Sequence, residues 1–418
     1  MAKTLLFVTS RLPFPPNSGR KVSLYHYCRG LAERGYDVHL FVFPEWDQER
    51  SDAGKPDFIR EVRFAAPIGK ARRLLNLFGK SLLGGAPLQC ALYDSKKNRR
   101  AIRAYAKEIG ADAVMTDMIR LAPYFHAVKD LPCRKIADLD DLLSRRYARQ
   151  RASNSASDAA GHFAGNMPSF LRKCNRGALG KMILRFEEKR VRRAEVRYAR
   201  LYDAVILVSQ NEADLLNERL GEKKAFAVPM GVDADYFAAL APEENAEKPA
   251  EGIAFVGNLH VAANQDSLRY LAREVLPLLK NNSPLRAIGP VPDEIRAEFA
   301  DLSRVTFVGE VPDLRPAVRG CAVALYPVAY GSGIKTKVLE AMAMGVPVVT
   351  NETGAENIDA VWGEDLFVEE TPAALAARTD ELLEDPALRR AVAKRAQKLV
   401  KERYDWASVF EKFADAGL

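Results

Sequence analysis

Short runs of apolar residues alternate along the first half of the chain with longer segments of mixed character. The runs are TLLFVTS (4–10), DVHLFVFP (37–44), ADAVMTD (111–117), CRKIADLD (133–140) and YDAVILVS (202–209). A segment such as KVSLYHYCRGLAERGY has the apolar spacing of an amphipathic helix, and Gly35 is placed to end it. Strands that alternate with helices in this way predict a parallel sheet with crossover helices.

The same pattern starts again in the second half of the chain. Its apolar runs are GIAFVGN (252–258), PLRAIGP (284–290), RVTFVGE (304–310), CAVALYPV (321–328), GVPVVTNE (345–352) and EDLFVEE (364–370). Between the halves, residues 238–252 are rich in Ala, Glu and Pro and have no periodicity, which is typical of a surface connection. Residues 151–166 have the composition of a mobile loop.

These patterns predict an α/β protein of two Rossmann-like domains with parallel sheets, followed by a long amphipathic C-terminal helix. The boundaries that we expect are 1–228 for the first domain, 229–251 for a hinge, 252–395 for the second domain and 396–418 for a C-terminal helix that packs toward the first domain. Parallel sheets bind ligands at the carboxyl ends of their strands. If the two sheets face each other, the ligand lies in a cleft between the domains.

Composition narrows the class of protein. The chain has 418 residues, and its five cysteines are dispersed, without the spacing of a disulfide framework or a metal site. The first apolar run is too short for a signal peptide or a membrane span. We therefore expect a cytoplasmic protein. Residues 1–251 carry a formal charge of +12 and residues 252–418 one of −5, so the first half is the better candidate for an anionic partner.

The chemistry-bearing stretch is YGSGIKTKVLEAMAMGVPVV, residues 330–349. Gly331, Ser332 and Gly333 follow a strand and precede a helix, so backbone N–H groups at the helix start can bind an anion. Lys335 and Lys337 add positive charge where the helix dipole is already positive, and a bound diphosphate would make that arrangement favourable. The alternative is a pair of solvated lysines, with Ser332 as an ordinary N-cap.

KVLEAMAMGVPVV resembles the nucleotide-sugar-binding motif of GT-B glycosyltransferases, specifically the family-4-like retaining enzymes. Supporting segments are FVGN (255–258), VPMGVDADYF (228–237), VTFVGEVPDLRP (305–316), GAENI (354–358) and RLPFPPNSGRK (11–21). The chain is most similar to bacterial exopolysaccharide-associated sugar transferases. The resemblance implies that the first domain binds the acceptor and the second binds the nucleotide sugar.

The resemblance also implies roles for individual residues. Glu340 would bind the ribose, as the acidic residue of a Rossmann site does, and the backbone around Val311 would contact the base. On the donor side the matching positions also include Gly257, Asn258, Gly331, Ser332, Gly333, Lys335 and Lys337. Gly19 would let the N-terminal loop approach the diphosphate, Arg20 is a candidate phosphate partner, and Asp117 stands where the family often has a histidine near the transferred sugar.

Two positions depart from the family. Ser332 stands where a glutamate normally helps to position the donor sugar, and no basic residue follows FVGN until Arg269. The diphosphate charge would then be met by Lys335 and Lys337.

Asp138-Leu139-Asp140 has the form of a DxD metal motif, which belongs to the other glycosyltransferase fold. We expect no metal site and no cofactor. Asp140 and Asp141 are instead candidates for the acceptor side of the cleft, and capping of the following helix is an equal alternative.

Two basic stretches remain. Residues 68–84 mix cations with leucines and Phe78, as an interfacial helix attracted to anionic lipid does. The strongly basic segment 170–200 has no motif that reads nucleic acid, so we expect no nucleic-acid partner.

The leading hypothesis is a glycosyltransferase that moves a sugar, with retention, from a UDP- or GDP-sugar to a hydroxyl of a polysaccharide or lipid-linked acceptor. It would build cell-surface polysaccharide, peripherally at the inner face of the plasma membrane. The alternatives are a GT-B-fold nucleotide-sugar epimerase or hydrolase, and a non-catalytic nucleotide-sugar-binding scaffold. A dinucleotide oxidoreductase is disfavoured because the first strand–helix turn lacks GxGxxG.

Overall fold

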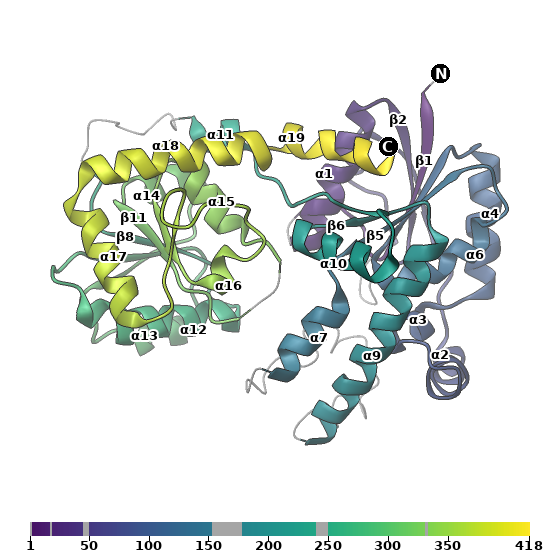
Figure 1. The fold of residues 1–418 in the computed structure, drawn as a ribbon, viewed down its shortest axis with the longest axis horizontal. Coiled ribbons are helices and arrows are strands. Elements are labelled where there is room, and N and C mark those ends of the chain that lie inside the picture. Colours follow the sequence, from purple (N-terminus) through teal and green to yellow (C-terminus); the bar gives the residue numbers. More distant parts are fainter. Residues whose placement is uncertain (1, 17–18, 45–49, 153–177, 240–249, 331–332) are drawn as a thin grey trace. The chain divides into compact units, whose positions relative to one another are not determined.

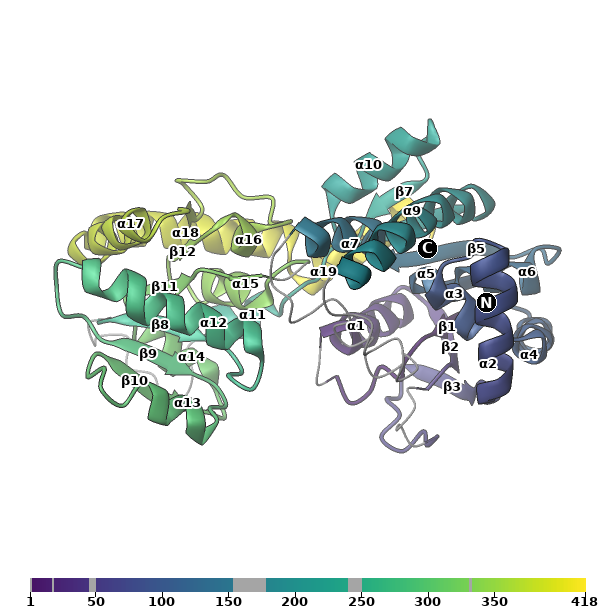
Figure 2. The same cartoon turned by 90° about the horizontal axis from the view of Figure 1, so that it is seen from below.

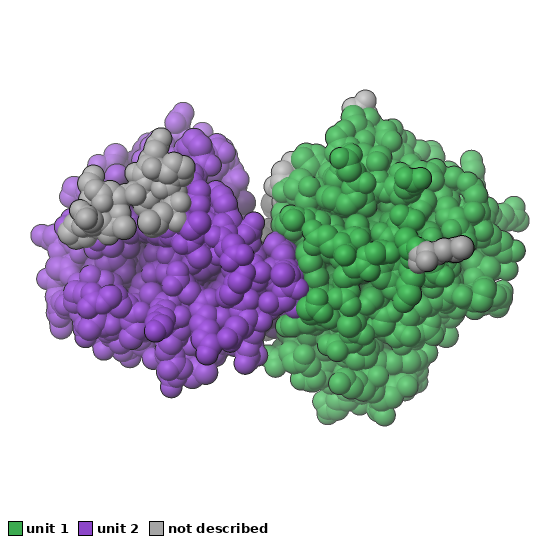
Figure 3. Space-filling model, turned by 90° about the horizontal axis from the view of Figure 1, so that it is seen from above, with its two compact units in different colours: residues 1–228, 410–418 green, residues 229–409 purple. Residues whose placement is uncertain are grey.

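The computed structural model describes residues 2–16, 19–44, 50–152, 178–239, 250–330 and 333–418. The chain divides into two compact units, which Figure 3 colours separately. Unit 1 comprises residues 1–228 and 410–418, and unit 2 comprises residues 229–409. The loop expected at 151–166 lies, apart from its first two residues, outside the described ranges, as do residues 240–249 of the expected hinge.

Unit 1 contains a seven-stranded sheet in the order β3-β2-β1-β4-β5-β6-β7, with every neighbouring pair parallel. Its strands are β1 (Lys3–Thr9), β2 (Tyr36–Val42), β3 (Ile59–Phe64), β4 (Ala113–Asp117), β5 (Arg134–Asp140), β6 (Ala204–Leu207) and β7 (Ala225–Ala227). The run Leu5–Val8 forms an interior strand because it is apolar throughout and has no exposed side chain. The strand order reverses between β1 and β4, so a crevice is expected at the carboxyl ends of these two strands.

Helices surround this sheet, as a parallel sheet requires. They are α1 (Gly19–Glu33), α2 (Lys70–Asn76), η1 (Leu77–Leu83), α3 (Leu88–Tyr93), α4 (Lys96–Glu108), α5 (Met118–Leu121), η2 (Ala122–Tyr124), α6 (Phe125–Val128), α7 (Leu143–Ala152), α9 (Ala178–Leu201), α10 (Gln210–Leu220) and η6 (Lys412–Ala416). Gly35 follows α1 with a φ of +88°, as expected of a residue that ends a helix.

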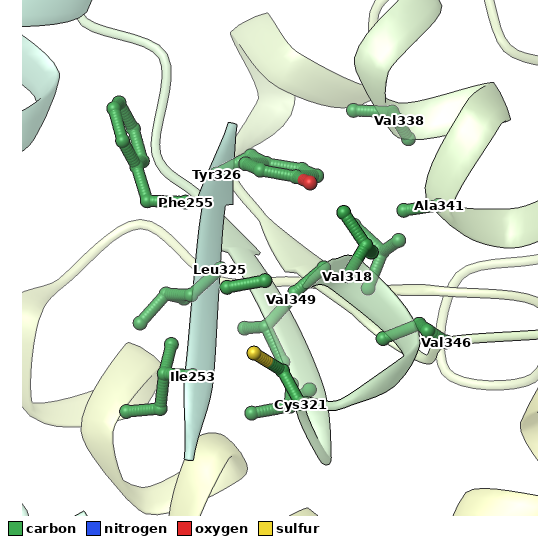
Figure 4. Packing of buried hydrophobic residues seen from close by; sticks show 14 of the residues in the cluster. Ile253, Phe255, Val318, Cys321, Leu325, Tyr326, Val338, Ala341, Val346 and Val349 are labelled. Atoms are coloured by element: carbon green, nitrogen blue, oxygen red, sulfur yellow. The ribbon is translucent and has the colours of Figure 1, made fainter. Parts of the chain in front are cut away.

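Unit 2 contains a six-stranded parallel sheet in the order β10-β9-β8-β11-β12-β13. Its strands are β8 (Ile253–Val256), β9 (Leu285–Ile288), β10 (Val305–Gly309), β11 (Val323–Tyr326), β12 (Val348–Thr350) and β13 (Phe367–Val368). The order reverses between β8 and β11. Figure 4 shows the packed core beside these strands, where Phe255, Leu325 and Val349 lie among buried apolar side chains.

The helices of unit 2 cover both faces of its sheet (Figures 1 and 2). They are α11 (Ala234–Ala238), α12 (Ala262–Tyr270), η4 (Leu271–Val275), η5 (Leu276–Leu278), α13 (Asp293–Glu298), α14 (Leu314–Arg319), α15 (Thr336–Ala343), α16 (Glu352–Ala355), α17 (Pro372–Glu384), α18 (Pro386–Arg403) and α19 (Trp406–Glu411). The chain leaves unit 2 within α19, and residues 410–418 belong to unit 1. The prediction of an α/β protein with two parallel sheets is confirmed.

Candidate functional site

The donor-side candidates of unit 2 gather where β8 and β11 end. Gly257 follows β8, and a side chain there would meet Asn264 of α12 at 3.0 Å. Gly289 follows β9 with a φ of +128°, and a Cβ on it would lie 2.4 Å from the carbonyl oxygen of Gly257. At Gly289 backbone meets backbone, which only a residue without a Cβ allows, whereas at Gly257 the close neighbour is the Asn264 side chain. The loops after β8 and β9 therefore approach each other closely at the carboxyl edge of this sheet.

The loop after β11 is held by hydrogen bonds from neighbouring elements. The Asn351 side chain accepts from the N–H of Val328 at 3.0 Å and donates to the carbonyl of Val328 at 3.0 Å. The hydroxyl of Tyr330 donates to Asp266 of α12 at 3.0 Å. Gly331 and Ser332, predicted from sequence to bind the donor, lie outside the described residues. Gly333 has a φ of +78°, which favours glycine.

Lys335 and Lys337 lie at the start of α15. Lys335 occupies the N-cap position, and its Nζ donates to the carbonyl of Gly333 at 2.7 Å. Lys337 donates to Oδ1 of Asn264 at 3.2 Å and lies 5.0 Å from the ring centre of Phe255. Two ammonium groups thus accompany the first N–H groups of the helix. This arrangement favours a bound anion and is costly without one.

Burial shifts the pKa values of two side chains of this helix in opposite directions. It raises the pKa of Glu340 to about 7, with Lys337 and a hydrogen bond from Thr336 working against the rise. It lowers the pKa of Lys337 to about 8, and the charge of Lys335 adds to that fall. Strongly perturbed neighbours of this kind mark candidate functional sites.

Two further donor-side positions can be placed. Val311 lies just after β10, partly buried against the core of unit 2. The side chain of Asn258 accepts from the N–H of His260 at 2.9 Å and so shapes the loop after β8. Tyr326, which sequence reasoning did not single out, ends β11 with its hydroxyl directed toward α15 (Figure 4). That hydroxyl is buried and has no hydrogen-bond partner among the described residues.

The candidates of unit 1 gather around the buried guanidinium of Arg20. Its Nε and Nη2 donate to Oδ1 of Asp117 at 3.1 and 2.9 Å. Its Nη1 donates to Asp140 at 3.0 Å, and Nη2 also donates to Asp138. Asp117 accepts further from the N–H of Ser10 at 2.9 Å. The guanidinium of Arg20, expected to meet phosphate, therefore faces three carboxylates in this structure.

This cluster forms because β1, β4 and β5 are neighbouring parallel strands with their carboxyl ends at one edge. The backbone there is unusual: Met118 and Asp140 have φ values of +62° and +66°. Residues other than glycine seldom adopt this conformation, and in folded proteins it concentrates at functional positions. Gly19, the first residue of α1, has open space where a Cβ would stand.

Arg20 donates hydrogen bonds to all three carboxylates, and Arg11 and Arg146 also attract Asp117 and Asp140, respectively. Burial raises the pKa of Asp138 to about 7, although Arg20 opposes the rise. Burial also raises the pKa of Asp140. For Asp117, the attraction of Arg20 and the hydrogen bonds from Ser10 outweigh burial and lower the pKa. The cluster can thus hold a proton near neutral pH.

The two acceptor-side candidates have different partners. Asp140 binds Arg20, and its side chain is 20 % exposed. Asp141 accepts instead from Nε of Arg146 in α7 at 2.8 Å. Sequence reasoning missed Ser10, and it considered Asp138 only as part of a metal motif. The sequence could have pointed to both residues, because each lies at the carboxyl end of a buried apolar run and these ends meet at the same edge of the sheet.

Two features are absent from the residues that the structure describes. In that part of the chain, no group of three or more His, Cys, Asp or Glu side chains is arranged to hold a metal ion. Among the described helices, none combines the length and the apolar character that crossing a bilayer needs.

Comparison with known proteins finds a family match in the second half of the chain. Residues 250–385, which contain the whole donor-side cluster of unit 2, match the family described as "Glycosyl transferases group 1". The second half of the chain thus carries a group 1 glycosyltransferase domain. The likeness to family-4-like glycosyltransferases noted in the sequence thus agrees with an independent comparison.

Solved structures share the GT-B fold over the whole chain. Sucrose-phosphate synthase from Thermosynechococcus elongatus is 18 % identical, with a TM-score of 0.65 over 99 % of this chain and 98 % of that one. HepE of Anabaena, in a structure with UDP, is 16 % identical, with a TM-score of 0.64 over 99 % and 98 %. A Klebsiella pneumoniae 44.6 kDa protein from the cps region is 21 % identical, over 98 % of each chain.

Proposed function

We propose that this glycosyltransferase moves a hexose from a UDP-sugar to a hydroxyl of a glycan or lipid-linked acceptor, with retention at the anomeric carbon. The bond between the anomeric carbon and the diphosphate oxygen breaks, and a bond to the acceptor oxygen forms. The acceptor proton leaves with the diphosphate or to solvent. We place the reaction in cell-surface polysaccharide synthesis, in the cytoplasm at the inner face of the membrane.

The observation that carries the proposal is the start of α15. Lys335, Lys337 and the first N–H groups of the helix make a cationic site, and Glu340 lies about one turn further on. A nucleoside diphosphate offers the complementary groups, two phosphates and a ribose diol. Charge that develops on the leaving diphosphate would be stabilised by these fixed donors, which is a large source of rate in such reactions. Gly257, Asn258 and Val311 complete the proposed donor side.

UDP is proposed as the nucleotide because HepE, which shares the fold, is described in complex with UDP. The cps region of the Klebsiella relative supports a role in surface polysaccharide. In unit 1, we propose that Asp140 and Asp141 face the acceptor, with Gly19, Arg20 and Asp117 beside the transferred sugar. The domain roles follow: unit 1 binds acceptor and unit 2 binds donor.

Donor screening by thermal shift tests the nucleotide. UDP-sugars should raise the unfolding temperature more than GDP- or dTDP-sugars, because only the preferred ligand binds the folded state at low concentration. Stabilisation by NAD and by no sugar nucleotide would refute the proposal. UDP release that requires a lipid-linked or glycan acceptor supports a transferase, whereas release without acceptor supports a hydrolase. UDP binding with no turnover on any acceptor supports the non-catalytic scaffold.

Site variants test the assignment. Glu340→Ala and Lys335→Ala should each lower turnover by at least about 100-fold while the fold is retained. A matched control is Lys398→Ala with Glu402→Ala, an exposed pair on α18 whose side chains are 74 % and 59 % accessible. Full activity in both site variants would contradict the donor site.

A further inference from the structure

The exposed apolar side chains of the described chain are concentrated in one region of unit 1. Seven of the fourteen large ones lie on α2, η1 and the first half of α9. They are Leu74, Leu75, Phe78, Leu82 and Leu83 of α2–η1, and Met182 and Phe186 of α9. Leu83 is 88 % exposed, and Leu75, Phe78 and Leu82 each exceed 60 %. Such concentration marks an interaction surface rather than the ordinary scatter of apolar residues. We call these seven residues the apolar ridge.

The body of unit 1 holds α2–η1 firmly in this orientation. Asn76, Leu77 and Ser81 are buried on its inner side, and Nδ2 of Asn76 donates to the carbonyl of Asp94 at 2.9 Å. Lys80 forms an ion pair with the buried carboxylate of Asp94, so it faces the protein. The apolar side chains therefore point outward because the inner side is occupied. They cannot be buried by rotating the helix without breaking these contacts.

The α9 helix continues the same surface. Nη1 of Arg190 lies 3.4 Å from Oγ of Ser81, and Glu187 accepts from the N–H of Leu88 at 2.9 Å. Phe186 and Met182 lie four and eight residues before Arg190, so the three share one stripe of the helix. Figure 1 shows α2 and the first part of α9 at the same end of unit 1. The ridge is thus carried by α2–η1 and by the first part of α9, which the contact between Arg190 and Ser81 joins.

The exposed charged side chains on α2, η1 and α9 are all cationic. The chain has no Asp or Glu from residue 62 to residue 93. Lys70 and Arg72 on α2, and Arg185 and Lys189 on α9, are exposed. None of the four has an ion-pair partner among the described residues. A surface that is apolar and cationic is complementary to one that is apolar and anionic.

We propose that unit 1 docks on an anionic lipid bilayer through the apolar ridge, with Leu82, Leu83 and Phe186 inserted among the acyl chains and the four cations at the headgroups. This matches how interfacial helices bind membranes. A second copy of the chain fits less well, because a two-fold contact places like charges against each other. The docking surface is independent of the transfer reaction, since it uses no residue of the proposed donor or acceptor side.

Vesicle flotation tests the apolar half of the proposal. The full chain should float with phosphatidylglycerol–phosphatidylcholine vesicles, and Leu82→Ser with Leu83→Ser should lower the partition coefficient by at least about tenfold, given the apolar surface lost from the acyl region. Phe186→Ser should lower it further in that background. Leu278→Ser with Val361→Ser, which removes two side chains of 51 % and 54 % exposure from unit 2, should leave it unchanged. Equal flotation of ridge and control variants would overturn the proposal.

The contribution of the four cations is tested on the same vesicles. Lys70→Ala with Arg72→Ala should lower partitioning roughly fivefold per cation, and added salt should weaken binding of the wild type. Arg390→Ala with Lys394→Ala, an exposed pair on α18, is the matched control. Equal binding to pure phosphatidylcholine vesicles would overturn the role of anionic lipid.

Two measurements separate this proposal from its rivals. Light scattering in the absence of lipid should show one unchanged mass for the wild type and the ridge variants; a wild-type dimer that the serine changes dissociate would overturn the proposal in favour of a second copy. UDP should stabilise the ridge variants as it does the wild type. If the ridge variants no longer float but are still stabilised by UDP, the change affects membrane docking alone. If UDP stabilises neither the wild type nor the variants, the proposed donor site is refuted, and the docking proposal is unaffected.

Discussion

Glu340 and Lys337 lie three residues apart on α15, and burial moves their pKa values toward each other, to about 7 and about 8. Both charges are costly in the free protein, because α15 and the strands beside it replace much of their hydration. A ligand that pairs with them recovers that cost, since it supplies the hydrogen bonds and counter-charge that water no longer provides. Without a ligand, these two buried charged groups therefore make the folded protein less stable than apolar side chains at the same positions would.

Removal of the Glu340 charge should stabilise the free protein at high pH. A folded pKa of about 7, raised from an ordinary 4.5, contributes stability that is present below the unfolded value and lost as the pH rises through 7. Glu340→Gln should therefore gain about 1–3 kcal/mol over the wild type at pH 8 and little at pH 5. Urea unfolding at the two pH values measures this. Glu402→Gln on the exposed face of α18 should show no such difference; a pH-independent effect of Glu340→Gln would contradict the assignment.

Arg20 acts on three carboxylates at once, so its loss should be severe and dependent on pH. Arg20→Ala should destabilise the protein by about 3–5 kcal/mol near pH 8, because buried charges lose their partner. The pKa values of Asp138 and Asp140 are raised by burial even beside Arg20, and loss of the guanidinium should raise that of Asp117 as well. The cost of the unpaired carboxylates therefore grows as the pH rises, and the defect should shrink toward pH 5. Chemical denaturation across this range measures it.

The control for Arg20 is a second substitution in the same cluster. Asp138→Asn in the Arg20→Ala background should restore part of the stability, because it removes one of the uncompensated charges. A defect that is constant from pH 5 to pH 8, or that Asp138→Asn does not relieve, would show that Arg20 does not serve as the counter-ion of these aspartates.

At the scale of elements, the ends of β8 and β9 fit together through glycine. The N–H of Gly257 donates to the carbonyl of Ile288 at 2.9 Å, and the N–H of Gly289 donates to the carbonyl of Gly309 at 2.8 Å. These bonds extend the sheet by one residue past its strands. The loops around the proposed nucleotide site begin at these strand ends. The spacing of the strand ends therefore determines where the backbone groups of the loops meet a ligand.

Gly289→Ala should be much more damaging than an ordinary glycine substitution. Its Cβ would lie 2.4 Å from a carbonyl oxygen, and its φ is +128°, so we expect a loss of more than about 3 kcal/mol. Gly363→Ala, at a φ of +88° with open space around it, should cost only about 1–2 kcal/mol. Denaturant unfolding compares the two. Equal losses would mean that backbone conformation, and not the contact with Gly257, makes Gly289 necessary.

At the scale of the molecule, each unit has its own core, but unit 1 is completed by the last residues of the chain. The Phe410 ring fills the space above Gly30, where a Cβ would lie 2.2 Å from it. Phe413 packs against Tyr27 with ring centres 5.1 Å apart, and Arg134 donates to the carbonyl of Ala416 at 2.8 Å. A segment separated from unit 1 by the whole of unit 2 in sequence is therefore part of its core.

Phe410→Ala should destabilise unit 1 by about 3–5 kcal/mol, because it leaves a cavity over Gly30. Calorimetry with and without UDP separates the units: the transition that UDP raises belongs to unit 2 and should keep its temperature, while the other should fall. Leu278→Ser, which removes an exposed side chain, is the control. A single transition that falls as a whole would show that the units unfold together.

The sequence by itself determined both parallel α/β sheets and the first turn of α15. Their signals are local: a buried strand is a short apolar run, and the spacing of Lys335, Lys337 and Glu340 along one helix follows from helix geometry. The amphipathic character of residues 68–84 was readable for the same reason. The sequence did not show which face of this segment is buried, because the residues that contact its inner face, Asp94 and those of α9, come from outside the segment.

Only the tertiary structure decided the partners of Arg20. Its carboxylates lie 97, 118 and 120 residues away in sequence, and they meet because β1, β4 and β5 end at one edge. Sequence places each aspartate at a strand end but does not say which strands are neighbours. The guanidinium was thus expected to meet a phosphate, whereas the fold surrounds it with aspartates. Strand order is set by packing over the whole sheet, and no local pattern of residues encodes it.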